Sequence, residues 1–132
     1  MRSRDLFHQR FEFITLDAGK RLRGIEESVL EGYSAAKKRD MRRSIGLFAR
    51  LIYWGTEVLR ISWKPNHAPI EYCRLLAGAV DGESGNNSAV IHAVLRAGEL
   101  FDKALYSSQP LTRPERDQFK AFVEEATSSD LL

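Results

Sequence analysis

The sequence predicts an all-α fold, a bundle of about five helices around one central buried helix, with no sheet. The stretch Ile45–Ile61 places apolar residues on two adjoining stripes of a helix, so it needs apolar neighbours on two sides. Other stretches repeat apolar residues at intervals of three and four, as helices do. No run alternates polar and apolar residues over a convincing length, which is the pattern typical of strands.

The totals predict a single domain over residues 1–132. The chain is 43% hydrophobic and 29% charged, as ordered globular proteins are, and its single cysteine excludes an internal disulfide. Arg50 and Glu57 interrupt the central apolar run, which is shorter than the roughly 20 residues that a bilayer requires. The first residues carry charges where a signal peptide has an apolar region, so we expect a cytoplasmic location.

The first helix is predicted to be continuous from Leu6 to Ala36, because its apolar residues repeat every 11 positions. A break near Gly19 is the alternative. A helix this long exceeds one side of a compact bundle, so we expect a homodimer in which the Phe7–Ile14 segment meets a second subunit. A chain folded back at Gly19 would instead stay monomeric.

The central helix is predicted to start after Asp40, whose carboxylate is a suitable N-cap, and to end before Pro65. Its narrow polar side carries Arg50, Tyr53, Glu57 and Arg60. The segment between Ile61 and Pro69 contains two prolines and no periodicity, so it is predicted to be a connecting loop.

Three shorter helices complete the predicted bundle. Pro69 fits the first turn of the third helix, with Cys73 on its buried stripe. The fourth spans about 88–106 and is predicted to carry a Glu99–Lys103 ion pair. Thr112 and Glu115 form a capping box that starts the fifth.

Charge is unevenly distributed along the chain: residues 1–50 carry a net charge of +5 and residues 51–132 carry −3. Basic clusters at Lys20–Arg23 and Lys37–Arg43 suit an anionic partner, either a phospholipid surface or nucleic acid. The candidate partner-binding residues in the second cluster are Lys37, Lys38, Arg39, Arg42 and Arg43. A solvated helix end and linker is the alternative interpretation.

Trp63 and Tyr72 flank the predicted proline loop and are candidates for a partner-binding groove, because aromatic rings beside a loop often anchor a partner. Packing of these rings in the core is the alternative. The sequence contains no phosphate-binding glycine loop, and His67, Glu71 and Cys73 lack the ligand number and spacing of a zinc site. We therefore predict no catalytic residues, no cofactor and no metal, and a protein that is not an enzyme.

A series of landmarks resembles one protein family. In order they are Gly55, Arg60, Ala68-Pro69-Ile70-Glu71-Tyr72, Phe101, Tyr106, Pro110-Leu111 and Thr112. Residues 40–127 resemble the uncharacterised helical domain at the C-terminal, cytosolic end of bacterial membrane-anchored transglutaminase-like proteins. Ala68 stands where the family pattern has a capping threonine, and the basic segment 1–38 lies outside the likeness.

The resemblance implies a non-catalytic interaction or scaffold domain at the inner face of a bacterial membrane. Its partner would be another protein or the membrane-anchored remainder of its own chain. The basic first half would then face an anionic membrane surface, as cytosolic segments beside a membrane do. A helical protein that binds nucleic acid through the same basic half is the alternative.

Overall fold

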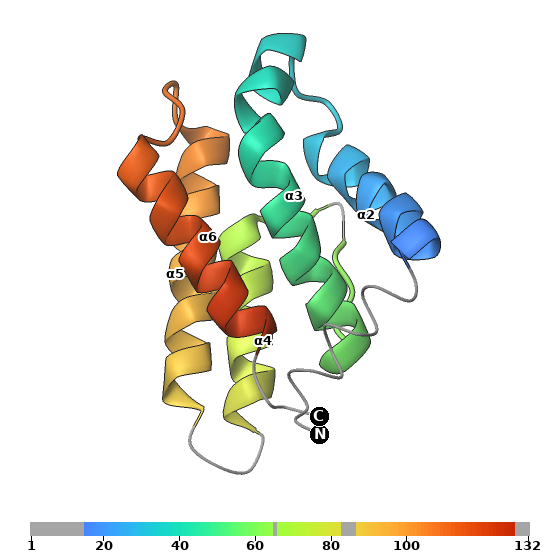
Figure 1. The fold of residues 1–132 in the computed structure, drawn as a ribbon, viewed down its shortest axis with the longest axis vertical. Helices are drawn as coiled ribbons and strands as arrows, with labels where there is room; N and C mark the ends of the chain where they lie inside the picture. Colours follow the sequence, from blue (N-terminus) through green and yellow to red (C-terminus); the bar gives the residue numbers. More distant parts are fainter. Residues whose placement is uncertain (1–14, 65, 83–86, 129–132) are drawn as a thin grey trace.

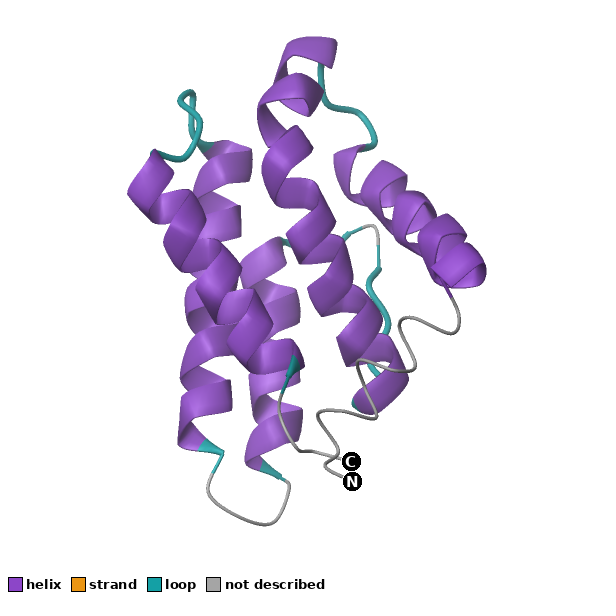
Figure 2. Ribbon diagram, viewed as in Figure 1, coloured by secondary structure: helices purple, strands orange, loops and turns teal. Residues whose placement is uncertain are grey.

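The computed structural model describes residues 15–64, 66–82 and 87–128. These residues form five helices and no strand, which confirms the predicted all-α bundle (Figure 2). The helices are α2 (Thr15–Leu30), α3 (Ala35–Val58), α4 (Pro69–Asp81), α5 (Ser88–Tyr106) and α6 (Arg113–Thr127). Helices α3 to α6 follow the long axis of the molecule, and α2 lies against one flank of α3 (Figure 1).

Helix α3 is the centre of the bundle, as predicted, but it ends at Val58 and not at Ile61, because Arg60 takes a left-handed conformation with a φ of 62°. It has ten buried residues, more than any other described helix, and it contacts α2, α5 and α6. A row of stacked rings connects α3, α5 and α6: Phe48 stacks on Phe101 with ring centroids 4.1 Å apart, and Phe101 stacks on Phe119 at 5.8 Å. Tyr53, expected on the polar side, is buried instead.

The boundary between the first two helices differs from the prediction. Helix α2 continues through Gly19, ends at Leu30 and is followed by a turn in which Gly32 has a φ of 87°. Only glycine adopts this backbone at no steric cost, so the chain breaks here rather than near Gly19. The Phe7–Ile14 segment, on which the expected dimer depends, lies outside the described residues.

Ser34, and not Asp40, is the N-cap of α3. Its hydroxyl accepts a hydrogen bond from the backbone N–H of Lys37, and Asp40 lies within the helix. The periodicity alone did not show this start, because the polar first turns of α3 contribute little apolar pattern. The basic cluster at 37–43 is therefore helical and is not a linker.

The other helix starts agree with the sequence. Pro69 lies in the first turn of α4, and Thr112 and Glu115 form the predicted reciprocal capping box at the start of α6. The predicted Glu99–Lys103 pair is replaced by two others, because Lys103 pairs with Glu115 across the α5–α6 turn and Arg96 pairs with Glu99. Among the described residues, no helix is both long and apolar enough to cross a membrane.

Candidate functional site

The loop from Leu59 to Ala68, described except for residue 65, connects α3 to α4 and passes beneath α2 (Figure 1). We call it the connecting loop. At its start Arg60 takes a left-handed conformation with a φ of 62°, which lets the N–H of Ile61 bond the carbonyl of Gly55 at 3.1 Å. The hydroxyl of Tyr72 donates to the Ile61 carbonyl at 2.7 Å. The hydroxyl of Thr56 donates to the Ile52 carbonyl at 2.8 Å and makes a longer contact of 3.4 Å with that of Ile61. The loop thus starts from a fixed point on the bundle.

Tyr72 belongs to the core. Its ring is fully buried, and burial raises the pKa of its phenol. This side chain packs so closely on α3 that a Cβ added at Gly55 would lie 2.5 Å from its hydroxyl oxygen. Of the two aromatic candidates from the sequence, Tyr72 therefore positions the connecting loop and does not line a groove.

Trp63, the second aromatic candidate, lies half-buried in the connecting loop. Its ring makes edge contacts with Phe48 at 5.7 Å, with Tyr72 at 5.5 Å and with His67 at 5.8 Å. These contacts fix the indole, so its free edge is held in one orientation. Its Nε1 is buried and has no hydrogen-bond partner, which costs free energy unless a ligand or water supplies an acceptor.

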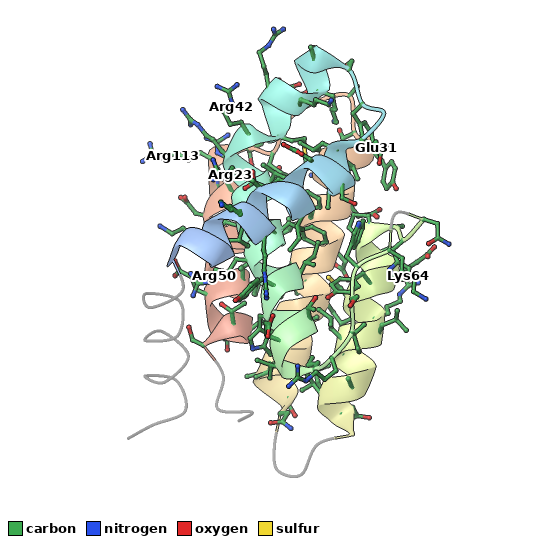
Figure 3. All side chains as sticks on the ribbon, turned by 90° about the vertical axis from the view of Figure 1, so that its right-hand side faces the viewer. Arg23, Glu31, Arg42, Arg50, Lys64 and Arg113 are labelled. Carbon is green, nitrogen blue, oxygen red and sulfur yellow. The ribbon has the colours of Figure 1, made fainter. Side chains whose placement is uncertain are left out.

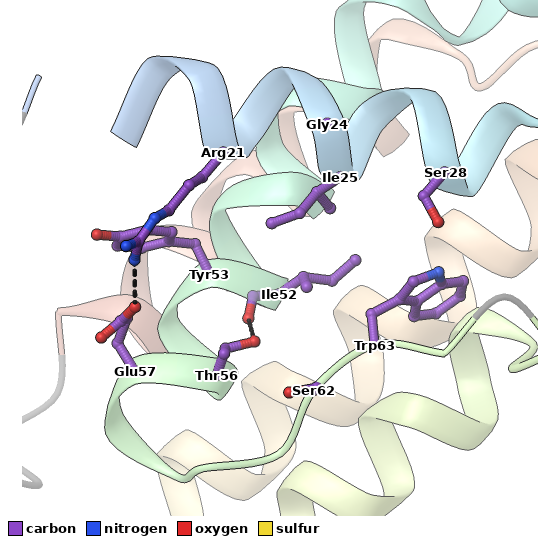
Figure 4. Close-up of a pocket in the computed structure, with 10 residues that line it drawn as sticks. All are labelled: Arg21, Gly24, Ile25, Ser28, Ile52, Tyr53, Thr56, Glu57, Ser62 and Trp63. Carbon is purple, nitrogen blue, oxygen red and sulfur yellow. Dashed lines mark hydrogen bonds and ion pairs between the residues drawn. The ribbon is translucent and has the colours of Figure 1, made fainter. Parts of the chain in front are cut away.

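A first cavity, of about 350 Å³, separates α2 from α3 and the connecting loop. We call it the α2 cavity. Its floor is apolar, with Ile25, Ile52 and Trp63, and an ion pair of 3.1 Å between Arg21 and Glu57 spans one side (Figure 4). The indole edge that carries Nε1 points toward Ser28 of α2.

A second cavity, of about 310 Å³, adjoins the first, since Ser28 and Trp63 line both. We call it the tyrosine cavity. Its walls come from three segments: the end of α2 and its turn, the connecting loop, and the end of α5. The side chains that give it its character are Glu31, Tyr33, Trp63, His67 and Tyr106.

The basic candidates of α3 divide into two groups. The ammonium of Lys37 is turned inward, where it donates to the carbonyl oxygens of Ala104 at 2.6 Å and Ser107 at 2.7 Å, at the C-terminal end of α5. Cations are favoured at this end of a helix. The other four, Lys38, Arg39, Arg42 and Arg43, are exposed.

The basic residues lie apart from the α2 cavity and the tyrosine cavity. None of the five lines the α2 cavity or the tyrosine cavity. In Figure 3, Arg42 and Arg113 lie on one side of the molecule, and Glu31 and Lys64 on the opposite side. The structure therefore brings together Trp63 and Tyr72, as the sequence suggested, but does not join them to the basic cluster.

In the described part of the chain, the side chains that could bind a metal or act as a nucleophile do not lie together in one site. Cys73 is fully buried where α4 packs on α5, and burial raises the pKa of its thiol. No three His, Cys, Asp or Glu side chains among the described residues lie close enough to hold a metal ion.

Sequence reasoning missed Glu31, Tyr33 and Tyr106 as site residues. They lie at the end of α2 and its turn and at the end of α5, far apart in the chain, and the fold places them around one cavity with Trp63. No local pattern marks such a site. Comparison of the chain with protein-family models, with curated proteins and with solved structures finds no match.

Proposed function

We propose that this chain is a non-catalytic interaction domain that lies against the inner face of a bacterial membrane, as the cytosolic part of a membrane-anchored protein. The first turns of α3 contact the anionic surface. The observation that carries the proposal is the arrangement of four exposed basic side chains there. Lys38 and Arg42 form one i,i+4 pair, and Arg39 and Arg43 form the next.

This arrangement opposes the ordinary preferences of a helix. Like charges four residues apart repel each other, and the positive end of the helix dipole disfavours cations. The first turn of α3 contains no acidic residue, and within positions 37–43 Asp40 is the single acidic residue among five basic ones. A third cavity, of about 290 Å³, is lined by Glu26 and Glu27 of α2 together with Lys38 and Arg42, so these carboxylates offset the two positive charges. Neither Arg39 nor Arg43 lines it. A surface of lipid phosphates relieves this repulsion, at about 1 kcal/mol per basic residue.

The likeness of residues 40–127 to the cytosolic family domain supports the membrane as the source of the anion. In such a setting the membrane-anchored remainder of the chain, or another protein, holds the domain near the lipid. Nucleic acid is the alternative partner, because its phosphates fit the same four side chains. The two proposals are distinguished by whether the purified domain binds anionic vesicles or a nucleic-acid duplex.

Vesicle flotation tests the proposal. We expect the protein to float with vesicles that contain phosphatidylglycerol, to stay behind with neutral phosphatidylcholine vesicles, and to dissociate as salt is added. The double variant Arg39→Glu/Arg43→Glu should lower binding by at least about tenfold. Lys64→Glu/Arg74→Glu, which changes the net charge equally at other exposed positions, should bind nearly as the parent does.

The same proteins are titrated with a short DNA duplex. Binding to the duplex at physiological salt that is tighter than binding to anionic vesicles, and that is lost in the Arg39→Glu/Arg43→Glu variant, would favour the nucleic-acid function. Equal loss of vesicle binding in both charge-reversal variants would show that binding depends on the net charge of the whole protein. That result would overturn the assignment of the membrane-binding surface to α3.

A further inference from the structure

The tyrosine cavity combines three aromatic residues, Tyr33, Trp63 and Tyr106, with a carboxylate, Glu31. Its volume, about 310 Å³, is at the lower end of the range of small-ligand pockets, so it has room for one side chain and not for a helix. Tyr33, Trp63 and Tyr106 line it from three different segments. Tyr106 keeps 60% of its surface exposed, so this side chain is accessible to a ligand.

Aromatic rings around a cavity attract cations, because the face of each ring carries partial negative charge. Trp63 is the strongest of the three in this respect, and its contacts with Phe48 and Tyr72 hold it in place. Because these neighbours already hold the indole in place, a ligand that binds it loses little free energy to ordering the side chain.

Carboxylates add to this preference for positive charge. Glu31 lines the cavity directly. Around Tyr106, burial, the neighbouring Tyr33 hydroxyl, Asp102 and Glu71 all raise the pKa of the phenol. One oxygen of Asp102, Oδ1, is buried without a hydrogen-bond partner. The ammonium of Lys37 donates to two carbonyl oxygens at the α5 end, which offset its charge there.

The unpaired N–H donor of Trp63 further limits which ligands fit the cavity. A bare ammonium ion cannot accept a hydrogen bond from Nε1, whereas a peptide carbonyl can. Nε1 points to Ser28, at the junction of the two cavities (Figure 4). A ligand that carries a carbonyl next to a cationic side chain satisfies both features once the buried Nε1 is uncovered beside Ser28.

We propose that the tyrosine cavity binds the side chain of an arginine on an exposed segment of a partner protein, with a main-chain carbonyl of that segment accepting from Nε1 of Trp63. Arginine fits better than lysine, because its planar guanidinium stacks on rings and has five N–H donors for Glu31 and the two tyrosine hydroxyls. This site shares no residue with the basic face of α3, so it stands independently of membrane binding.

Nuclear magnetic resonance of the indole groups gives a direct test. The chain has two tryptophans, and Trp54 lies in the core, 1% exposed, as an internal reference. N-acetyl-arginine N-methylamide should shift the Trp63 Nε1–H resonance in a saturable manner and leave that of Trp54 in place. The citrulline analogue, which is neutral and nearly the same shape, should not bind, and the lysine analogue should bind more weakly.

Two exposed residues of the site supply variants that leave the core intact. Glu31→Gln and Tyr106→Leu should each weaken binding of the arginine probe by at least about fivefold. Glu27→Gln, which removes an equal charge from an exposed position of α2 outside the cavity, should keep the parent affinity. Unchanged affinity in Glu31→Gln and Tyr106→Leu, or equal binding of the citrulline analogue, would overturn the proposal.

A final comparison identifies the source of the guanidinium. A pentapeptide with a central arginine between alanines should bind at least as tightly as the blocked amino acid. Binding of free arginine or agmatine without binding of the pentapeptide would make the site one for a small molecule and would contradict a protein partner. No shift of the Trp63 indole with any of these probes would end the inference.

Discussion

At the scale of single residues, two glycines set how closely α4 approaches its neighbours. A Cβ at Gly55 would lie 2.5 Å from the hydroxyl oxygen of Tyr72 and 2.7 Å from Cδ2 of Leu76, and one at Gly98 would lie 2.7 Å from Cβ of Cys73. All three distances are shorter than a Cβ atom tolerates. These positions require glycine because of packing, while Gly32 requires it because of its backbone angle.

We therefore expect Gly55→Ala to destabilise the protein by about 2 kcal/mol, since the added methyl group must displace Tyr72 and Leu76. Gly78→Ala is the matched control, because it lies in α4 with nothing within 4 Å of its Cβ position. It should stabilise the protein by about 0.5–1 kcal/mol through helix propensity. Urea unfolding of the three proteins gives both values, and a loss of stability in Gly78→Ala would contradict this reading of the contacts.

At the scale of elements, the two capped helix starts show what local sequence can and cannot predict. The capping box of α6 lies in four consecutive residues, so its pattern can be recognised without the structure. Ser34 caps α3 before a polar run, where Asp40 is an equally good cap by residue type. Gly32 decides between them, because its left-handed conformation ends α2 just before Ser34.

Removing the hydroxyl of the capping box should weaken the start of α6. Thr112→Ala leaves the N–H of Glu115 without its acceptor, which lies at 3.3 Å. We expect a loss of about 1 kcal/mol in the free energy of unfolding, measured by urea denaturation. Thr112→Ser keeps the hydroxyl and serves as the control. An unchanged midpoint for the alanine variant would mean that the last helix starts elsewhere.

Glu115 also makes the start of α6 sensitive to acid. The hydrogen bond from Lys103, and then those from the N–H and hydroxyl of Thr112, lower the pKa of Glu115 from 4.5 to about 2. A carboxyl whose pKa is lower in the folded state contributes stability above its unfolded pKa, and that stability is lost as pH falls through the folded value.

Stability should therefore fall as the pH is lowered from 4.5 to about 2. Glu115→Gln should flatten this part of the profile, and added salt should reduce the effect because the side chains are near solvent. Thermal unfolding at a series of pH values compares the two proteins. The same slope in both would show that other carboxyls carry the acid dependence.

At the scale of the whole molecule, α2 stands apart from the other described helices. Helices α3 to α6 pack on one another, whereas among the helices α2 makes its substantial contacts with α3 only. The α2 cavity and the tyrosine cavity lie along its inner face. The periodicity of the sequence predicted the bundle well, because each helix carries its own apolar stripe. The periodicity did not predict the cavities, because each cavity lies between several helices and loops, whereas periodicity describes one helix at a time.

This arrangement predicts an uneven pattern of amide hydrogen exchange. The amides of α2 should exchange through a local opening, with free energies below that of global unfolding, while those of α3 and α5 should exchange only when the whole bundle unfolds. Exchange followed by nuclear magnetic resonance at several low urea concentrations separates the two. Equal protection of α2 and α3 would show that the five helices unfold as one unit.

The contacts of Lys37 restrict which substitutions the basic cluster at 37–43 tolerates. A single compact ammonium serves two carbonyl oxygens at the end of α5, and the flat, wider guanidinium of arginine does not fit that geometry in the same way. The neighbouring exposed positions need only positive charge. In a library in which positions 37, 38, 39, 42 and 43 each vary between lysine and arginine, selection for stable folding should fix lysine at 37 and leave the other four free to exchange.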